Sequence, residues 1–321
     1  MSEFELWVLF GVIICVSLSF DLGIINKVRT RLKNKSESED EVKVEEGSFR
    51  HALFRFLIWV SLAGIFAIMI FITLGNEKTL EFTTGYIIEE SLSVDNMLLF
   101  LLVFTTLGIP HKYQHKILSV GILSAIVMRI VVILVGSTLL ENIHWMIYVF
   151  GGILLVGAFR MMLQRQEQKI DLEKNISVKI LKKIIPIQTE IKELKFFTKI
   201  NGVLYATPLL VALIIIEMTD LVFAMDSIPA VLAITTDPFI VITSNIFAIS
   251  GLRALYFLIS KTISKFHYLK TGLIVLLFFI GIKMMTSEFY EIPKVLSFIV
   301  IIAILGTTII ASIIRTSKLN K

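Results

Sequence analysis

Acidic side chains occur in two stretches of this sequence that are otherwise apolar, EESLSVDNM at 89–97 and EMTDLVFAMDSIPA at 217–230. If such stretches cross a lipid bilayer, each ionised carboxylate costs about 2.5–3.5 kcal/mol, so the acids must be paired, protonated or bound to a cation. Carboxylate, amide and hydroxyl oxygens suit Mg²⁺, Ca²⁺ or Mn²⁺, and neither stretch contains the His or Cys that Zn and Cu favour. The residue types therefore predict a site for a hard divalent cation. Its candidate ligands are Glu89, Asp95, Asn96, Glu217, Asp220, Asp226 and Ser227.

Two arginines, Arg129 and Arg253, lie near the middle of other apolar stretches and are the candidate charge-balancing partners of these acids. One interpretation is purely structural, because buried Asp–Arg pairs can hold helices together. The five carboxylates among the candidate ligands outnumber the two arginines, however, and a bound cation would neutralise the excess. Clustered acids do not all ionise together when the site is empty, so we expect protons to bind in place of the metal.

The spacing of these residues predicts how they face one another. Residues seven apart share a face of an α-helix, which groups Asp220 with Ser227 and Glu89 with Asn96. The same geometry points the remaining two aspartates away from those faces.

Pro229 offers a way to bring the aspartates back. It lacks an N–H and its ring crowds the carbonyl of Met225, so we predict a helix break that re-aims Asp226 and frees carbonyl oxygens. The stretch that contains Asp95 has no such proline. Asp21, in the first apolar stretch, is either part of an acidic pathway or an interfacial residue.

The composition of the whole chain is that of a membrane protein. Of the 321 residues 56% are hydrophobic, and the mean hydropathy is +0.84, whereas soluble domains are about 45–50% apolar. A span needs about 20 mostly apolar residues. The predicted fold class is all-α, a polytopic protein of the lipid bilayer with about nine transmembrane helices. The predicted spans are about 4–26, 54–74, 84–107, 117–140, 144–163, 204–233, 239–260, 270–286 and 294–314.

Positive charges predict the orientation of these spans. Lys and Arg cluster after every odd-numbered span, and the opposite loops are short and poor in them. The positive-inside rule then places the N-terminus outside and the C-terminus in the cytoplasm. The linker 27–53 and the loop 164–203 are cytoplasmic in this arrangement. Because the net charge of +5 comes from these clusters, we expect no nucleic-acid partner; the oligomeric state is left open by the sequence.

The two acidic stretches belong to an internal repeat. SLSVDNM at 91–97 aligns with VFAMDSI at 222–228, and AIVMR at 125–129 aligns with ISGLR at 249–253. Residues 84–163 form the first copy and 204–286 the second, between two N-terminal helices in 1–75 and a C-terminal helix at 294–314. The first copy enters the membrane from outside and the second from inside, so the two form an inverted repeat of three helices each. Transporters built in this way bind substrate near the midplane, between the repeats.

The sequence resembles the TerC family through EESLSVDNMLLF, EMTDLVFAMDSIPAVLAITTDPF and SNIFAISGLRALYFL, and NGVLYATPL is similar to its Alx-like branch. The resemblance implies a protein of the bacterial inner membrane in the LysE-type transporter group, associated with manganese export and tellurium resistance. The family's acidic positions fall on the seven candidate ligands named above. Ser250 and Arg160 stand where the family usually has a larger apolar residue and a lysine.

These observations lead to one functional hypothesis and two rivals. We expect a transporter, not an enzyme, that moves Mn²⁺ or another hard divalent cation out of the cytoplasm by alternating access, coupled to protons and without a prosthetic group. The first rival is an intramembrane aspartyl protease, although neither SVDN nor AMDS has the glycine pattern of such enzymes. The second is a membrane component of a metal or tellurite stress-resistance complex that transports nothing.

Overall fold

The computed structural model describes residues 3–21, 49–143, 145–163, 178, 181, 185–188, 195–200, 202–260, 268–287, 289–290 and 292–319. The side chains of Asp21, Asp95 and Asp226 are outside this description, although their backbones lie in helices. Nine helices of at least 18 residues occupy the described ranges. They are α1 (Glu3–Asp21), α3 (Phe49–Leu74), α4 (Asn76–Thr106), α5 (His111–Asn142), α6 (Met146–Leu163), α8 (Pro208–Leu232), α9 (Pro238–Ser260), α10 (Leu269–Thr286) and α11 (Lys294–Leu319).

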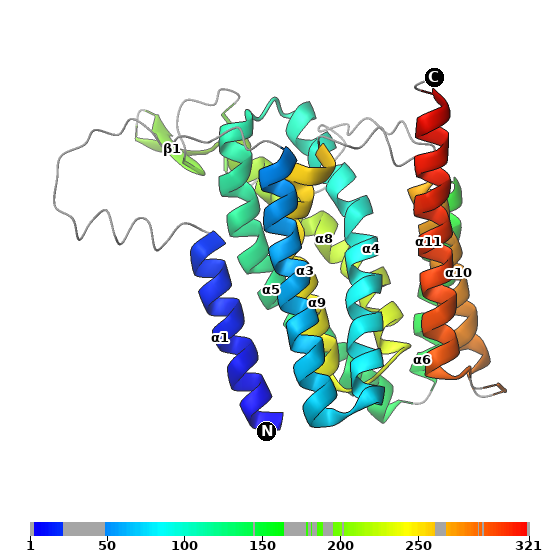
Figure 1. The fold of residues 1–321 in the computed structure, drawn as a ribbon. Coiled ribbons are helices and arrows are strands. Elements are labelled where there is room, and N and C mark those ends of the chain that lie inside the picture. The colour runs from blue at the N-terminus through cyan, green and yellow to red at the C-terminus, as the bar shows by residue number, and fades with distance from the viewer. Residues whose placement is uncertain are drawn as a thin grey trace.

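Each of the nine predicted apolar spans overlaps one of these helices. Among the described residues, seven helices are long and apolar enough to cross a membrane, and α1 and α4 are not among them. In α4 the acids at Glu89, Glu90 and Asp95 interrupt what would otherwise be an apolar span. The chain is therefore a predominantly helical, polytopic membrane protein, while nine membrane crossings remain a prediction. The two ends of the chain lie at opposite ends of the bundle (Figure 1).

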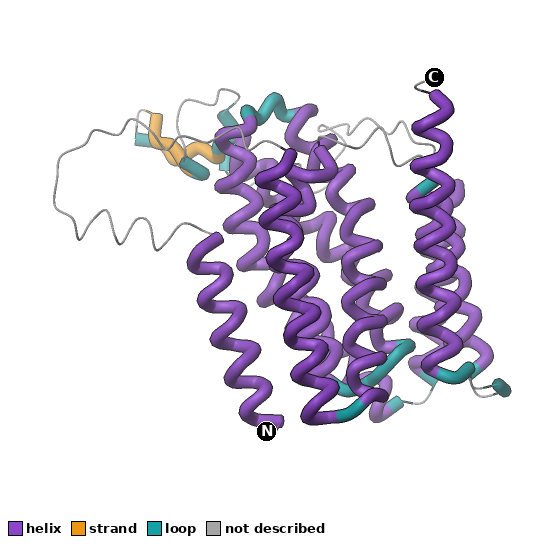
Figure 2. The backbone as a smooth tube through the Cα atoms, in the orientation of Figure 1, coloured by secondary structure: helices purple, strands orange, loops and turns teal. Residues whose placement is uncertain are grey.

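A β-hairpin precedes α8, where the sequence predicted only a loop and the start of a span. Strand β1 (Phe197–Ile200) pairs antiparallel with β2 (Val203–Ala206) (Figure 2). Gly202 in the turn has a φ of 84°, a conformation that glycine adopts without strain. The predicted span 204–233 is thus wrong at its start: α8 begins at Pro208, because proline suits the first turn of a helix. Most of the loop 164–203, and residues 27–48 of the linker, lie outside the described residues.

Helix α9 lies inside the bundle, and its apolar window is entirely buried. It packs against α4, α3, α5 and α1, while α5 also packs against α8, and α6 against α10. Aromatic rings join α1 to this core: Trp7 lies 4.9 Å from Phe239, and Phe10 lies 5.6 Å from Phe247, measured between ring centroids. The helices that carry the acidic stretches, α4 and α8, pack directly against each other.

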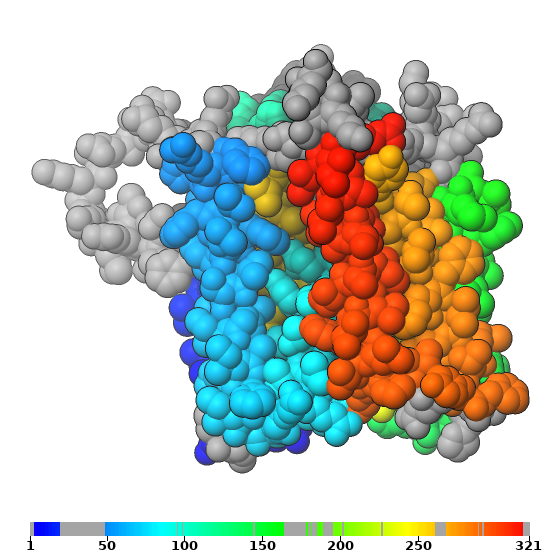
Figure 3. All heavy atoms as spheres, turned by 45° about the vertical axis from the view of Figure 1, so that its right-hand side comes forward, coloured from blue at the N-terminus to red at the C-terminus, as the bar shows by residue number. Residues whose placement is uncertain are grey.

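Helix α11 lies on the outside, against α10 and α4 (Figure 3). Near one end, the Ser312 hydroxyl accepts a hydrogen bond of 3.1 Å from the backbone N–H of Tyr268. Close to this contact Gly272 faces Thr308, and a Cβ atom at Gly272 would overlap the threonine side chain. The absence of a side chain at Gly272 allows α10 and α11 to approach closely.

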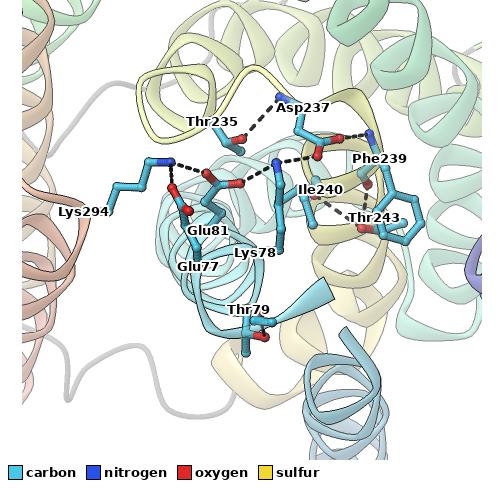
Figure 4. Close-up of polar contacts among 11 residues, drawn as sticks. Glu77, Lys78, Thr79, Glu81, Thr235, Asp237, Phe239, Ile240, Thr243 and Lys294 are labelled. Carbon is cyan, nitrogen blue, oxygen red and sulfur yellow. Dashed lines mark hydrogen bonds and ion pairs between the residues drawn. The ribbon is translucent and has the colours of Figure 1, made fainter. Parts of the chain in front are cut away.

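At the opposite end of α11, two lysines and three acids form a cluster that we call the ion-pair cluster (Figure 4). Lys294 at the start of α11 lies 2.6 Å from Glu77 and 2.6 Å from Glu81, both on α4. Lys78 lies 3.2 Å from Glu81 and 2.6 Å from Asp237, in the loop between α8 and α9. Glu81 is only 2% exposed, so its charge depends on these two ammonium groups. The cluster ties α4, α11 and the α8–α9 loop together.

Candidate functional site

The guanidinium of Arg129 is the centre of the buried polar groups. Arg129, on α5, is fully buried, and its Nη1 donates hydrogen bonds to Glu89 Oε1, to Ser227 Oγ at 3.0 Å and to Asn245 Oδ1 at 3.1 Å. Its Nη2 lies 3.5 Å from Asp220 Oδ1. Four helices, α4, α5, α8 and α9, thus each contribute a polar side chain to one point. We call this set of five residues the Arg129 cluster.

Helix geometry accounts for the contribution of α8. Asp220 and Ser227 are seven residues apart, and both reach Arg129, as their shared face predicted. Glu89 and Asp220 lie near the midpoints of α4 and α8. The two helices begin at opposite ends of the bundle (Figure 1). Their midpoints lie at the same depth, since Glu89 and Asp220 both contact Arg129.

The Arg129 cluster leaves many polar atoms unsatisfied. Within the described ranges, the second oxygen of Glu89 and both oxygens of Asp220 are buried without a hydrogen bond, as are Nε and Nη2 of Arg129. The ion pair between Nη2 and Asp220 therefore lacks hydrogen-bond geometry. An arginine and a carboxylate that serve only to hold helices together usually form two parallel hydrogen bonds. The arrangement has unused capacity for a cation.

Glu217 lines a small cavity beside the cluster. The cavity has about 20 Å³ of free space, which is room for one water-sized group. Its walls come from Phe100 on α4, Gly121 on α5, Leu252 on α9, and Glu217 and Asp220 on α8. Asp220 therefore belongs both to the cavity and to the Arg129 cluster.

The other predicted charge-balancing arginine has a separate environment. Arg253, on α9, donates a hydrogen bond of 2.9 Å to the hydroxyl of Ser119 on α5. Asn96 is buried on α4, two turns beyond Glu89. The roles predicted for Asp95, Asp226 and Asp21 remain predictions, because their side chains lie outside the described ones.

Helix α8 is not interrupted at Pro229, and the kink predicted there to re-aim Asp226 stays a prediction. The helix continues through Pro229 and ends at Leu232. A proline so close to the end of a helix removes one hydrogen bond but leaves only a short segment beyond it to be misaligned. Among the described side chains, no group of three or more His, Cys, Asp or Glu residues is placed so that it could hold a metal ion.

Comparison with known proteins identifies the family. The model of the integral membrane protein TerC family matches residues 74–320, from the end of α3 to the end of α11. The chain belongs to the TerC family. The matched range contains every member of the Arg129 cluster, and also Glu217 and Pro229.

TerC relatives share nearly the whole length of the chain. An uncharacterized membrane protein, STKORF319, of Myxococcus xanthus is 41% identical over 97% of this chain and 92% of its own. Proteins named "Putative membrane-bound redox modulator Alx" include that of Photorhabdus laumondii, 40% identical over 96% of this chain and 94% of its own. The protein of that name in Escherichia coli strain K12 is 42% identical over 79% of this chain and 81% of its own. No solved structure matches this TerC chain.

Sequence reasoning missed two buried polar residues of this TerC protein. Asn245 is fully buried on α9 and completes the Arg129 cluster. Glu90 follows Glu89 on α4, and both of its carboxylate oxygens are buried without a hydrogen bond among the described residues. Each was visible as a polar residue inside an apolar span, which is a sufficient signal for a functional candidate.

Proposed function

We propose that this TerC protein transports a divalent metal cation, with Mn²⁺ as its cargo, and exports it from the cytoplasm by alternating access. The main support is the group of buried carboxylate oxygens on Glu89 and Asp220 that have no hydrogen bond in the described bundle. Such oxygens are costly to bury alone, and a hard divalent cation takes six or more oxygen ligands at once.

The charge balance agrees with a divalent cargo. Glu89, Asp220 and Glu217 supply three negative charges when ionised, and Arg129 supplies one positive charge. The sum of −3 and +1 is −2, and the neighbouring buried acid Glu90 makes the site more negative when it is ionised, so a bound divalent cation would offset much of this charge. Asp95 and Asp226, six residues beyond Glu89 and Asp220 on the same helices, are further candidate ligands.

The donor atoms favour Mn²⁺ over softer metals. The Arg129 cluster offers carboxylate, hydroxyl and amide oxygens, and it contains no sulfur or imidazole. Oxygen sites of this kind suit Mg²⁺, Ca²⁺ and Mn²⁺. The resemblance of the acidic motifs to the TerC family, which is associated with manganese export, is the reason for proposing Mn²⁺ among these three.

Helix packing supports alternating access. α4 packs against α9, α5 packs against α8, and α6 packs against α10. A two-fold axis that relates the repeat α4–α6 to the repeat α8–α10 would map the contact of α4 with α9 onto the contact of α8 with α5. It would map the contact of α6 with α10 onto itself. Rocking of one repeat against the other would then expose the midplane site to each side in turn. We place the protein in the bacterial inner membrane with its N-terminus outside, and expect protons to return as the metal leaves.

The Alx relatives carry a name that points to a redox role. This chain has one cysteine, Cys15, so it cannot form a disulfide within itself. A redox effect would therefore not come from an intrachain thiol pair. The two rival functions inferred from the sequence predict different results. A protease would cleave transmembrane peptides, and a stress-resistance component would leave metal flux unchanged.

The decisive experiment is a transport assay with purified protein. The protein is reconstituted into liposomes that enclose a Mn²⁺-sensitive dye, and influx is recorded for the wild type and for Asp220→Asn, Glu217→Gln, Asp95→Asn and Asp226→Asn. We expect Mn²⁺ transport by the wild type and its loss in these variants. Glu141→Gln, an exposed acid at the end of α5, is the matched control and should transport normally.

Cellular metal content provides the complementary measurement. Cells with and without the protein are grown under Mn, Ca, Zn and Fe loads, and their metal content is determined by mass spectrometry. The proposal predicts lower cellular Mn when the protein is present. If the wild type moves no Mn²⁺ in liposomes and changes no metal content in cells, the transport proposal is wrong.

A further inference from the structure

The nitrogen Nη1 of Arg129 occupies the centre of a cage of oxygens. Three oxygens surround it, from Glu89 on α4, Ser227 on α8 and Asn245 on α9. Nη1 has two hydrogens, so three acceptors cannot each receive a hydrogen of their own. Oxygens that converge from three helices on one positive centre are arranged as the ligands of a cation are.

Among the described side chains, the same cage offers no hydrogen-bond acceptor to the other nitrogens of the guanidinium. Nε and Nη2 make no hydrogen bond within the described residues, although both are buried. A guanidinium is a planar group with five donors, and a site built for it would place acceptors along its whole edge. Here the hydrogen-bond acceptors concentrate on one nitrogen, while three carboxylate oxygens on Glu89 and Asp220, one of them in the ion pair with Nη2, accept no hydrogen bond in the described part of the chain. The cage fits a compact cation better than it fits an arginine.

Asn245 holds this arrangement in place. Its Nδ2 donates a hydrogen bond of 3.0 Å to the carbonyl of Val241, one turn earlier on α9. That bond directs Oδ1 of the same amide toward Arg129 Nη1, at 3.1 Å. The amide orientation is the one that satisfies both groups. Asn245 is therefore a positioning residue for Arg129 that does not carry a charge of its own.

We propose that Arg129 is an internal cation that alternates with the transported metal in this cage. The inference rests on the proposed function and specifies how the empty transporter returns. When the metal has left, Arg129 enters the cage and offsets part of the negative charge of Glu89 and Asp220, and the returning protons neutralise the rest, so the empty site crosses its occluded state without uncompensated charge. When the metal binds, it displaces Nη1. The apparent affinity for metal is then reduced by the fraction of molecules in which Arg129 fills the cage.

The test compares two modes of transport. Net flux into liposomes without internal Mn²⁺ requires the empty binding site to return to the side of the membrane on which metal binds. Exchange of radioactive for unlabelled Mn²⁺, with the metal on both sides, does not. For Arg129→Gln we expect net flux to fall by about tenfold or more and exchange to stay within about twofold of the wild type. Its apparent affinity for Mn²⁺ should rise by about tenfold if the cage is free in about a tenth of wild-type molecules.

Two further variants make the result specific. Arg160→Gln, the same change at an exposed arginine near the end of α6, should behave as the wild type in both modes. Asn245→Leu keeps every charge but removes the amide oxygen that holds Nη1, so it should lower net flux relative to exchange, as Arg129→Gln does, and by less. If Arg129→Gln does not fold, as judged by size-exclusion chromatography, Asn245→Leu decides the question alone.

The outcomes separate the two proposals. Failure of the wild type in both modes overturns the proposed function. A wild type that transports, together with an Arg129→Gln protein that keeps full net flux, overturns the alternation of Arg129 with metal. Loss of exchange together with net flux in folded Arg129→Gln also overturns it, because the arginine would then be needed while metal is bound. Loss of net flux alone supports the inference.

Discussion

The ion-pair cluster allows the energetic weight of a buried carboxylate to be compared with that of an exposed one. Lys294 binds two glutamates on α4 at the same distance, 2.6 Å, but Glu81 is 2% exposed and Glu77 is 71% exposed. We expect Glu81→Gln to destabilise the protein and Glu77→Gln to have little effect. The two substitutions are chemically identical, so the difference reports the burial of Glu81 together with its second lysine partner, Lys78.

The magnitudes follow from the environment of each acid. A hydrogen bond to a charged group contributes about 1.5–3 kcal/mol when buried, and the 40% exposure of Lys294 reduces this to about 1–2 kcal/mol for Glu81. Exposed pairs contribute much less than buried ones, and Glu77 is such an exposed partner. At about 2 °C per kcal/mol for a chain of this size, Glu81→Gln should lower Tm by about 2–4 °C.

The assay is thermal unfolding of the protein in lipid nanodiscs, followed by intrinsic fluorescence. Lys294→Met is combined with each glutamate variant to give two double-mutant cycles. The coupling energy should be clearly larger for Glu81 than for Glu77. Equal Tm shifts for Glu81→Gln and Glu77→Gln, or equal coupling energies, would refute the reasoning that burial decides the strength of these pairs.

The pH dependence of the same cluster has a predictable sign. Glu77 lies at the start of α4, before the predicted span, and its hydrogen bond to Lys294 together with the lysine charge lowers its pKa from the ordinary 4.5. A carboxyl with a lowered pKa stabilises the folded state above its ordinary pKa, and this contribution is lost as the pH falls through the lowered value. The Tm of the wild type should therefore fall more steeply on acidification below about pH 4.5 than that of Glu77→Gln.

Two other predictions concern glycines. Gly272→Ala should destabilise the contact of α10 with α11 by about 1–3 kcal/mol, because its Cβ would overlap Thr308. The control is Gly306→Ala on α11, whose Cβ meets nothing within 4 Å. It should change Tm little in the same unfolding assay. Gly121→Ala would place a Cβ 3.0 Å from Glu217 Oε1; we expect an apparent Mn²⁺ affinity lower by about two- to tenfold in liposomes, equivalent to about 0.4–1.4 kcal/mol. Unchanged affinity in that variant would show that the cavity beside Glu217 is not on the transport path.

The sequence was sufficient for the positions of the helices and for part of the site. Apolar runs of about 20 residues are a requirement of the bilayer itself, so their length and composition locate helices without knowledge of packing. The grouping of Asp220 with Ser227 also follows from local geometry, and both contact Arg129. Such features depend only on residues close together in the chain.

Other features depend on which helices touch, and only the tertiary structure decided them. Arg129 and Arg253 occupy equivalent places in the sequence, yet Arg129 is the one bound to Glu89, while Arg253 donates to Ser119. Asn245 joins the cluster because α9 lies inside the bundle, and no local pattern indicates which helix is central. The physical reason is that the rotation and depth of each helix are set by contacts with residues far away in the sequence, whereas the existence of the helix is set by its own residues and by lipid.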